Sequence, residues 1–201
     1  MIIVVEGVSA AGKTTWASRH SPAVVSELTG HPPDTDNVTA LGQYWSDRHS
    51  ERWQHGLALE HVHKVVCFDT DPLKIHYAWC LWQIGKDSRA AWMADVEASR
   101  ERVAQKRLGF ADQIVFLEPP EEVVRQQKAN DKVRRRSNFE THVRLYEPLR
   151  RWYMLLETLS PGRVVFNAHQ APDSTSMTLQ ADRYSLQLFD ALIDAADQPP
   201  K

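Results

Sequence analysis

The stretch GVSAAGKT, residues 7–14, most constrains what this chain can fold into. It matches the pattern G-x-x-x-x-G-K-[ST] at every position, and the apolar run 2–6 leads directly into it. Gly7 and Gly12 allow backbone angles and a close approach that a side chain would block. Backbone amides can then point at an anion, helped by the positive end of a following helix at residues 13–20. The stretch therefore predicts a phosphate-binding loop for ATP or GTP.

Two side chains of this loop have chemistry suited to a nucleotide bound with magnesium. Lys13 can neutralise the β- and γ-phosphates, and the Thr14 hydroxyl is an expected Mg²⁺ ligand. The nucleotide contacts are expected from Gly7, Ser9, Ala10, Ala11, Gly12, Lys13, Thr14 and Thr15. We therefore expect ATP and Mg²⁺ as cofactors.

Short apolar runs alternate with longer amphipathic segments along the chain, as is typical of an α/β protein. Strands are expected at 2–6, 23–27, 64–69, 112–118 and 162–167, and helices at 13–20, 39–62, 73–84, 88–108, 120–129, 139–159 and 177–196. The fold class is thus α/β, a P-loop NTPase whose five-stranded parallel sheet carries helices on both faces. One domain is expected over 1–196, with a frayed tail at 197–201.

Composition limits the classes of function. The 24 basic and 26 acidic side chains give a formal charge of −2, which argues against a nucleic-acid binder and against a nucleic-acid-processing ATPase. No apolar run reaches the roughly 20 residues that span a bilayer, and no signal peptide precedes the first strand. Cys67 and Cys80 lie in apolar stretches without CxxC spacing, as expected of reduced thiols. We expect a cytoplasmic protein without a membrane partner, either a monomer or a homodimer.

Carboxylates follow two of the expected strands. Asp69 ends the strand at 64–69, Asp71 follows it as a candidate substrate-binding residue, and Glu27 ends the strand at 23–27, all at the sheet edge where ligands bind. Asp69 can hold Mg²⁺ or accept the proton of an attacking hydroxyl, with Glu27 as the second candidate base. The alternatives are a helix N-cap for either aspartate, strongest for Asp71 before Pro72, and a plain surface role for Glu27.

Other residues are candidates for binding an acceptor molecule. Asp34 and Asp36 form a second DTD in a proline-rich loop, where turn chemistry is the alternative. Five of the seven tryptophans fall between residues 45 and 92. Trp45, Trp79 and Trp82 are candidate stacking surfaces for a flat ligand, and core packing is the alternative.

A basic run follows the fourth expected strand. Its cations include Lys128, Lys132 and the arginines Arg134, Arg135 and Arg136. Such a run is either a solvated face or a lid, at about 128–138, whose arginines clamp a transferring phosphoryl group and exclude water. A lid suits a kinase better than a switch or a motor.

The order of these motifs resembles that of P-loop kinases of small metabolites, most closely the nicotinamide riboside kinase domain and related AAA-type ATPase-kinase domains. The similar features are FDTDP at 68–72, the aromatic segment that ends at Gly85, and FADQIVFL at 110–117. Thymidylate and deoxynucleoside kinases resemble the chain more distantly. The resemblance implies that Asp69 serves Mg²⁺ or the acceptor hydroxyl, that the lid arginines contact phosphates, and that 167–172 lies near the adenine. The chain lacks the Asp-Gly-Xaa-Arg lid pattern expected of a close nicotinamide riboside kinase.

The sequence therefore predicts an ATP-dependent phosphotransferase that uses an alcohol group of a small nucleoside-like or aromatic molecule, or of an antibiotic, as acceptor. The alternative is a nucleotide-dependent regulatory ATPase that signals to a protein partner. No Asn-Lys-Xaa-Asp guanine-reading motif is present, which counts most against a GTP switch.

Overall fold

The computed structural model describes residues 1–28, 30–131, 138–167 and 182–198. Five strands and eight helices are assigned within these ranges. In chain order they are β1 (Ile2–Glu6), α1 (Lys13–His20), β2 (Ala23–Val25), α2 (Val38–Glu60), β3 (Val66–Asp69), α3 (Ile75–Gln83), α4 (Arg89–Ala104), β4 (Gln113–Phe116), α5 (Glu121–Asn130), α6 (Phe139–Arg144), α7 (Tyr146–Leu159), β5 (Val164–Phe166) and α8 (Leu186–Ala196).

The strands form one parallel sheet in the order β2-β3-β1-β4-β5, which confirms the predicted five-stranded α/β fold. β1 lies at the centre, with Val5 opposite Asp69 of β3 and Glu6 opposite Phe116 of β4. From β1 the chain first builds the sheet toward β3 and β2 and later, on the other side, toward β4 and β5. The loop after β1 therefore lies at a topological switch point, where ligands bind in open α/β sheets.

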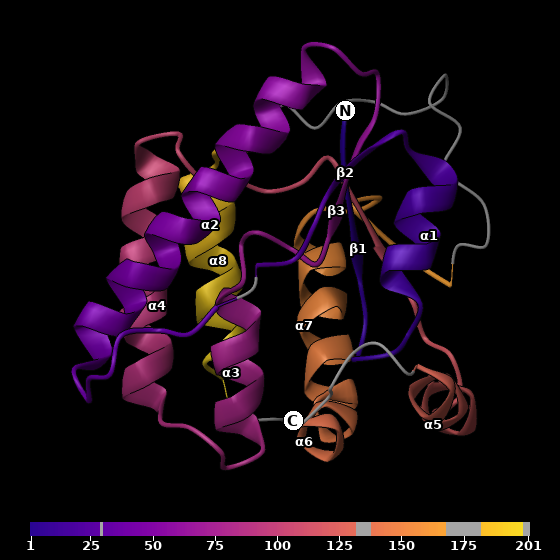
Figure 1. Ribbon diagram of the computed structural model, residues 1–201. Helices are drawn as coiled ribbons and strands as arrows, with labels where there is room; N and C mark the ends of the chain where they lie inside the picture. Colours follow the sequence, from indigo (N-terminus) through magenta and orange to yellow (C-terminus); the bar gives the residue numbers. More distant parts are fainter. Residues whose placement is uncertain (29, 132–137, 168–181, 199–201) are drawn as a thin grey trace.

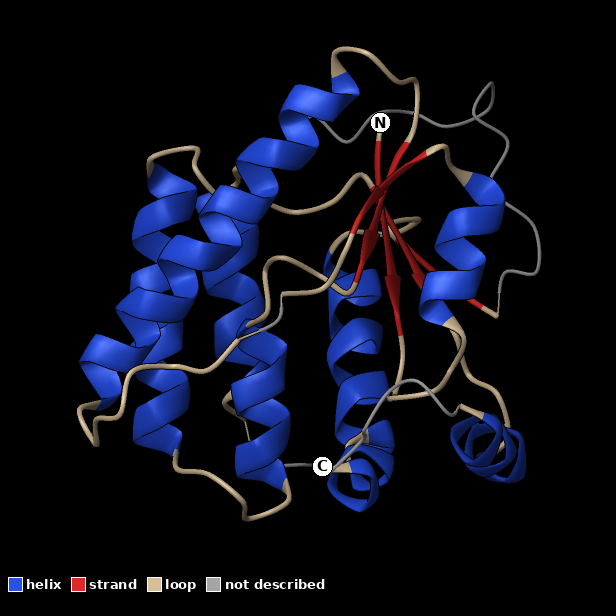
Figure 2. Cartoon of the chain, viewed as in Figure 1, coloured by secondary structure: helices blue, strands red, loops and turns tan. Residues whose placement is uncertain are grey.

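Successive side chains of β1 point to opposite faces of the sheet and pack into two different hydrophobic cores. Ile2 and Val4 belong to the large core under α2, α3, α7 and α8, whereas Ile3 and Val5 pack with Trp16 of α1. Figures 1 and 2 show α1 on one side of the sheet and the larger group of helices on the other. Both faces of the sheet are thus covered, as expected of a parallel sheet.

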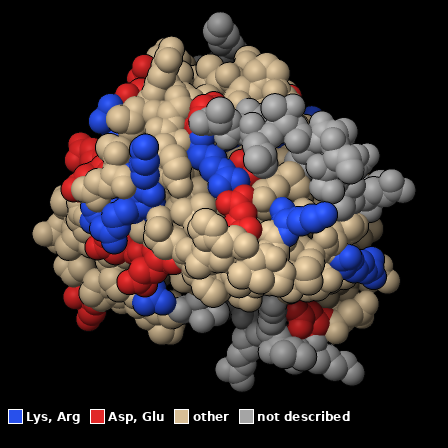
Figure 3. Space-filling view, turned by 90° about the horizontal axis from the view of Figure 1, so that it is seen from above, with Lys and Arg blue, Asp and Glu red and all other residues tan. Residues whose placement is uncertain are grey.

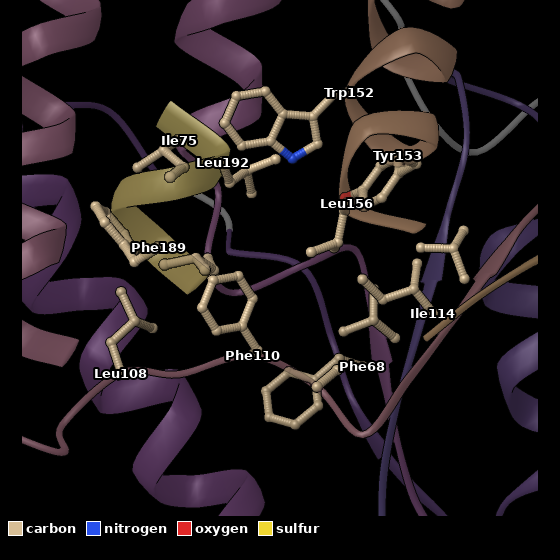
Figure 4. Close-up of a cluster of buried hydrophobic side chains, with 14 of the residues drawn as sticks. Phe68, Ile75, Leu108, Phe110, Ile114, Trp152, Tyr153, Leu156, Phe189 and Leu192 are labelled. Atoms are coloured by element: carbon tan, nitrogen blue, oxygen red, sulfur yellow. The ribbon is translucent and has the colours of Figure 1, made fainter. Parts of the chain in front are cut away.

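The large core is built from aromatic side chains of elements that are distant in sequence. Trp152 and Tyr153 of α7 belong to the same cluster as Phe68 of β3, Phe110 and Phe189 of α8, and Phe110 lies next to Phe68 (Figure 4). The ring centroids of Phe110 and Phe189 are 6.5 Å apart in an edge-on arrangement. Aromatic pairs of this kind add to the burial of apolar area.

Two predicted helices differ from the observed ones. The segment predicted as one helix over 139–159 is divided at Leu145 into α6 and α7. Pro148 has no N–H to donate to the Arg144 carbonyl four residues earlier, so the ladder cannot continue there. The helix predicted from 177 begins instead at Leu186, because Ser185 caps it by accepting a hydrogen bond from the Leu188 amide at 3.1 Å. Residues 177–181 lie outside the described residues.

An ion-pair network fastens the amino-terminal end of the sheet. Arg183 bridges Glu60 of α2 and Asp112, and Asp112 also accepts a hydrogen bond from the Ile2 amide at 2.7 Å. Figure 3 shows this end of the molecule, where acidic and basic side chains are interspersed on the surface. The hydrogen bonds from Arg183 and from the amino terminus of Met1 lower the pKa of Glu60 to about 2 despite its partial burial. None of the described helices is long and apolar enough to cross a membrane.

Candidate active site

The loop after β1 has the backbone geometry of an anion cradle. Gly7 has a φ of 144° and Gly12 a φ of 93°, and Ala10 between them has a φ of 66°. A Cβ placed on Gly7 would stand 2.7 Å from the carbonyl oxygen of Leu117, so no side chain fits there. Gly12 then caps α1 and directs the amino-terminal end of that helix into the cleft.

Hydrogen bonds hold two polar side chains of the loop in the cleft. Lys13 donates hydrogen bonds from Nζ to the carbonyls of Gly7 at 2.8 Å and Val8 at 3.0 Å, inside the cradle. The Thr14 hydroxyl donates to Oδ2 of Asp69, at the end of the neighbouring strand β3. A hydroxyl and a carboxylate side by side suit Mg²⁺, which takes one or two protein ligands and completes its shell with phosphate and water. Within the described residues, no group of three or more His, Cys, Asp or Glu side chains gathers to hold a metal.

Glu6 lines the cleft and was not identified from the sequence. Its buried carboxylate accepts hydrogen bonds from the amides of Gly7 and Asp71, each at 3.0 Å. It thereby joins the start of the phosphate loop to the loop that follows β3. His76 lies 3.5 Å from the same carboxylate, and burial lowers the pKa of His76 to about 4, so the imidazole is neutral. The signal was a carboxylate at the end of an otherwise apolar strand, immediately before the glycine loop.

The two aspartates at the end of β3, Asp69 and Asp71, point in different directions. Thr70 between them has a φ of 73°, a turn that sends Asp69 into the cleft and Asp71 into the core. Asp71 accepts hydrogen bonds from the Leu73 amide at 2.9 Å and from the Tyr153 hydroxyl at 3.3 Å. Burial raises the pKa of Asp71 to about 7. The expectation that Asp71 binds substrate is therefore wrong for this structure, and its turn-capping alternative describes what it does.

Glu27 lies at the same edge of the sheet, after β2. Its carboxylate accepts a hydrogen bond from Lys74 Nζ at 2.5 Å, and both side chains line the cleft. Burial raises the pKa of Glu27, but Lys74, Lys13 and Arg52 outweigh this effect and leave the pKa below its ordinary value. Glu27 is thus a carboxylate at neutral pH. Lys74 was not singled out from the sequence.

Arg52 of α2 is a second residue that was missed, and it holds two strand ends together. Its buried guanidinium donates to the carbonyls of Ser26 at 2.8 Å and Val25 at 3.2 Å, and also to the Asp69 carbonyl. Burial lowers the pKa of Arg52 to about 10, although Glu27 and Asp71 act in the opposite direction. Arg52 therefore fixes the ends of β2 and β3, from which Glu27 and Asp69 reach the cleft.

The cleft that these residues line has a volume of about 1200 Å³. It extends from Glu27, Lys74 and Tyr77, past the phosphate loop, to Glu118, Pro119 and Asn167 beyond β4 and β5. A smaller cavity of about 150 Å³ adjoins it, and Lys74 and Tyr77 line both. The larger volume alone exceeds the roughly 300–1,000 Å³ that is typical of a small-molecule site.

The three candidate tryptophans have different surroundings. Trp45 lines the smaller cavity, as a stacking surface should. Trp79 is fully buried and donates its indole N–H to the Ala196 carbonyl at 3.1 Å, so it is a core residue and the expected stacking role is wrong. Trp82 is half-buried and stacks on Trp92 at 5.4 Å between ring centroids, and it is not among the described residues that line the two cavities.

The remaining candidates lie at or beyond the limits of the described site. Asp34 and Asp36 occupy the exposed loop before α2, and neither lines the two cavities. In the expected lid, Lys128 belongs to α5, whereas Arg134, Arg135 and Arg136 lie outside the described residues.

The fold and the loop together define a P-loop protein with an α/β sheet. Three solved structures share this fold over nearly the whole chain, all of deoxyadenosine kinase from M. mycoides. The structure with the products dCMP and a flexible dCDP has a TM-score of 0.60 at 12% identity, with 97% of this chain and 98% of that chain covered. The structure with dATP has a TM-score of 0.55 at 10% identity and covers 98% and 100% of the two chains. The structure with dCTP has a TM-score of 0.54 at 11% identity and covers 97% and 98%. No protein-family model and no curated protein sequence matches the chain.

Proposed function

We propose that this protein is an ATP-dependent kinase that transfers the γ-phosphoryl group to a hydroxyl of a small nucleoside-like or aromatic molecule. One observation carries the proposal: a phosphate loop and an ionised carboxylate, Glu27, line the same cleft, beside a second cavity that can hold an acceptor. A protein that only hydrolyses its nucleotide has no need of that second cavity. The shared fold of the deoxyadenosine kinases supports the same class of reaction.

The phosphate end of the site would use the loop residues. Lys13 would leave the Gly7 and Val8 carbonyls to bind the β- and γ-phosphates, where its charge offsets the charge that develops on the leaving phosphate. Thr14 and Asp69 would hold Mg²⁺, which supplies further charge neutralisation when bound. We propose that Arg134, Arg135 and Arg136 close over the transferring group.

The acceptor end of the site would use Glu27. Its carboxylate would take the proton of the acceptor hydroxyl while the hydroxyl oxygen forms a bond to the γ-phosphorus. The bond from that phosphorus to the bridging oxygen breaks, and ADP leaves with the electron pair. Lys74, held against Glu27 at 2.5 Å, keeps the carboxylate ionised and oriented. Asp69 is occupied by Thr14, which leaves Glu27 as the better candidate for the base.

The test measures ADP release from Mg-ATP with and without a panel of nucleosides and hydroxyl-bearing antibiotics. Mass spectrometry of each product shows whether a phosphoryl group has been added. Release that rises with one compound, together with the phosphorylated product, is the expected result. Release that is the same with every compound would overturn the kinase proposal and favour a regulatory ATPase.

A further inference from the structure

The smaller cavity limits the acceptor by size. Its volume of about 150 Å³ equals that of an engineered protein cavity that holds benzene, so one six-membered ring fills it. A fused two-ring base needs more space than this. Building on the kinase proposed above, we infer that the acceptor is an uncharged nucleoside-like molecule whose base is a single six-membered heterocycle of the pyrimidine type.

The walls of the cavity match a flat ring. Trp45 and Tyr77 are aromatic, and Leu28 and Ile75 add aliphatic surface. Trp45 is held in place by His49, whose ring is stacked at 6.1 Å between centroids with 25° between planes. Aromatic and aliphatic walls bind the faces of a ring, and they leave its edge to be recognised by polar groups.

Polar atoms for that edge come from one side of α2 and from α4. Ser46 and His49 both line the cavity, and the Ser46 hydroxyl and Nδ1 of His49 are buried without a hydrogen-bond partner among the described residues. Ser46 is 2% exposed, so its hydroxyl is cut off from bulk water. An unpaired buried hydroxyl costs free energy, which a ligand with a matching heteroatom recovers. Asp95 and Ser99 of α4 add two more polar groups to the lining.

The charge around the cavity favours an uncharged ring. Burial, with Lys74 and Arg52, lowers the pKa of His49 well below its ordinary value, so its imidazole is neutral. Burial, with a smaller effect of Asp87, raises the pKa of Asp95 to about 7, so that near neutral pH much of it carries no charge. Lys74 on the shared wall is paired with Glu27, so neither residue offers a free charge to a ring in the cavity. A pyridinium ring, as in nicotinamide riboside, would therefore lose its hydration without a full counter-charge and would bind less well than a neutral pyrimidine.

The experiment is calorimetric titration of the full chain, loaded with Mg²⁺ and a non-hydrolysable ATP analogue. The titrants are deoxycytidine, thymidine, deoxyadenosine and nicotinamide riboside. We expect deoxycytidine or thymidine to bind at least tenfold more tightly than the other two compounds. Ser46→Ala should weaken that pyrimidine nucleoside by about five- to tenfold, the loss of one buried hydrogen bond. Ser18→Ala, on the exposed side of α1, is the matched control and should change nothing.

Three results would overturn the inference: deoxyadenosine or nicotinamide riboside binding as tightly as the pyrimidines, neither pyrimidine binding, or Ser46→Ala binding like wild type. If Ser46→Ala does not fold, as judged by circular dichroism, the comparison of ligands on the wild-type chain decides alone. Because the titration requires no phosphoryl transfer, the two proposals fail separately. Pyrimidine binding without stimulated ADP release refutes only the kinase, and phosphorylation of a purine nucleoside alone refutes only this inference.

Discussion

Replacing Glu27 with glutamine should lower kcat strongly while changing the stability of the fold only slightly. The substitution keeps the size of the side chain and removes its charge. The Glu27–Lys74 ion pair is 2.5 Å long, but the Glu27 side chain is 45% exposed, and such pairs stabilise a fold by about 1 kcal/mol at most. For a chain of this length, that corresponds to a fall in Tm of about 4 °C or less. Loss of a general base instead lowers kcat by about 10²- to 10⁴-fold.

The chain contains a matched control for this substitution. Asp190 pairs with Arg100 at 2.7 Å, its side chain is also 45% exposed, and it lies on α8, outside both cavities. Asp190→Asn should therefore lower Tm by a similar amount and leave kcat unchanged. The assays are thermal unfolding followed by circular dichroism, and ADP release with the acceptor found in the panel. A Glu27→Gln variant that keeps more than about a tenth of wild-type kcat would refute the base role. In the wild type, the activity should fall on the acid side only below about pH 4.5, because the pKa of Glu27 lies under that ordinary value.

Four further outcomes are expected. Lys13→Ala should lower turnover by about 10²- to 10³-fold with an unchanged circular dichroism spectrum, since the lysine acts on phosphate charge; near-normal turnover would contradict this. Asp69→Asn should raise the Mg²⁺ concentration needed for half-maximal turnover, and an unshifted magnesium titration would remove Asp69 from the metal site. Gly56→Ala should destabilise the fold by about 1–3 kcal/mol in urea unfolding, because the added Cβ would stand 2.1 Å from Cζ of Phe68; an unchanged midpoint would show that the ring moves aside. Glu60→Gln should make Tm fall less steeply between about pH 4.5 and pH 2. Because the pKa of Glu60 is lowered in the folded state, its carboxylate adds stability above about pH 4.5 that is lost as the pH falls toward 2. An equally steep fall in the variant would show that Glu60 is not the source of this acid sensitivity.

The phosphate loop could be predicted from the sequence because all of its defining residues are close together in the chain. The function predicted for it depends on backbone amides, two glycines, Lys13 and Thr14, all within one short stretch, so the spacing of these residues is enough to recognise the motif. The five strands and the first helix were also predicted correctly in kind, because apolar runs and helical periodicity are properties of neighbouring residues. Asp69 was identified as a candidate because it ends an apolar strand at the edge where ligands bind.

What the sequence left undecided depended on residues that are distant along the chain. Asp69 and Asp71 are two positions apart, and only the positive φ of Thr70 sends one into the cleft and the other toward Tyr153. The tryptophans look alike in sequence, but α8 covers Trp79 and leaves Trp45 beside a cavity.

The same reason explains the residues that were missed. Glu6, Arg52 and Lys74 have no motif of their own, and each acquires its role from a partner at least 17 positions away, such as Asp71, Asp69 or Glu27. The sequence by itself predicted a phosphate-binding loop and determined the kind of sheet that carries it. Only tertiary packing decided which carboxylates line the cleft, because the direction and pKa of a side chain depend on the neighbours that folding brings to it.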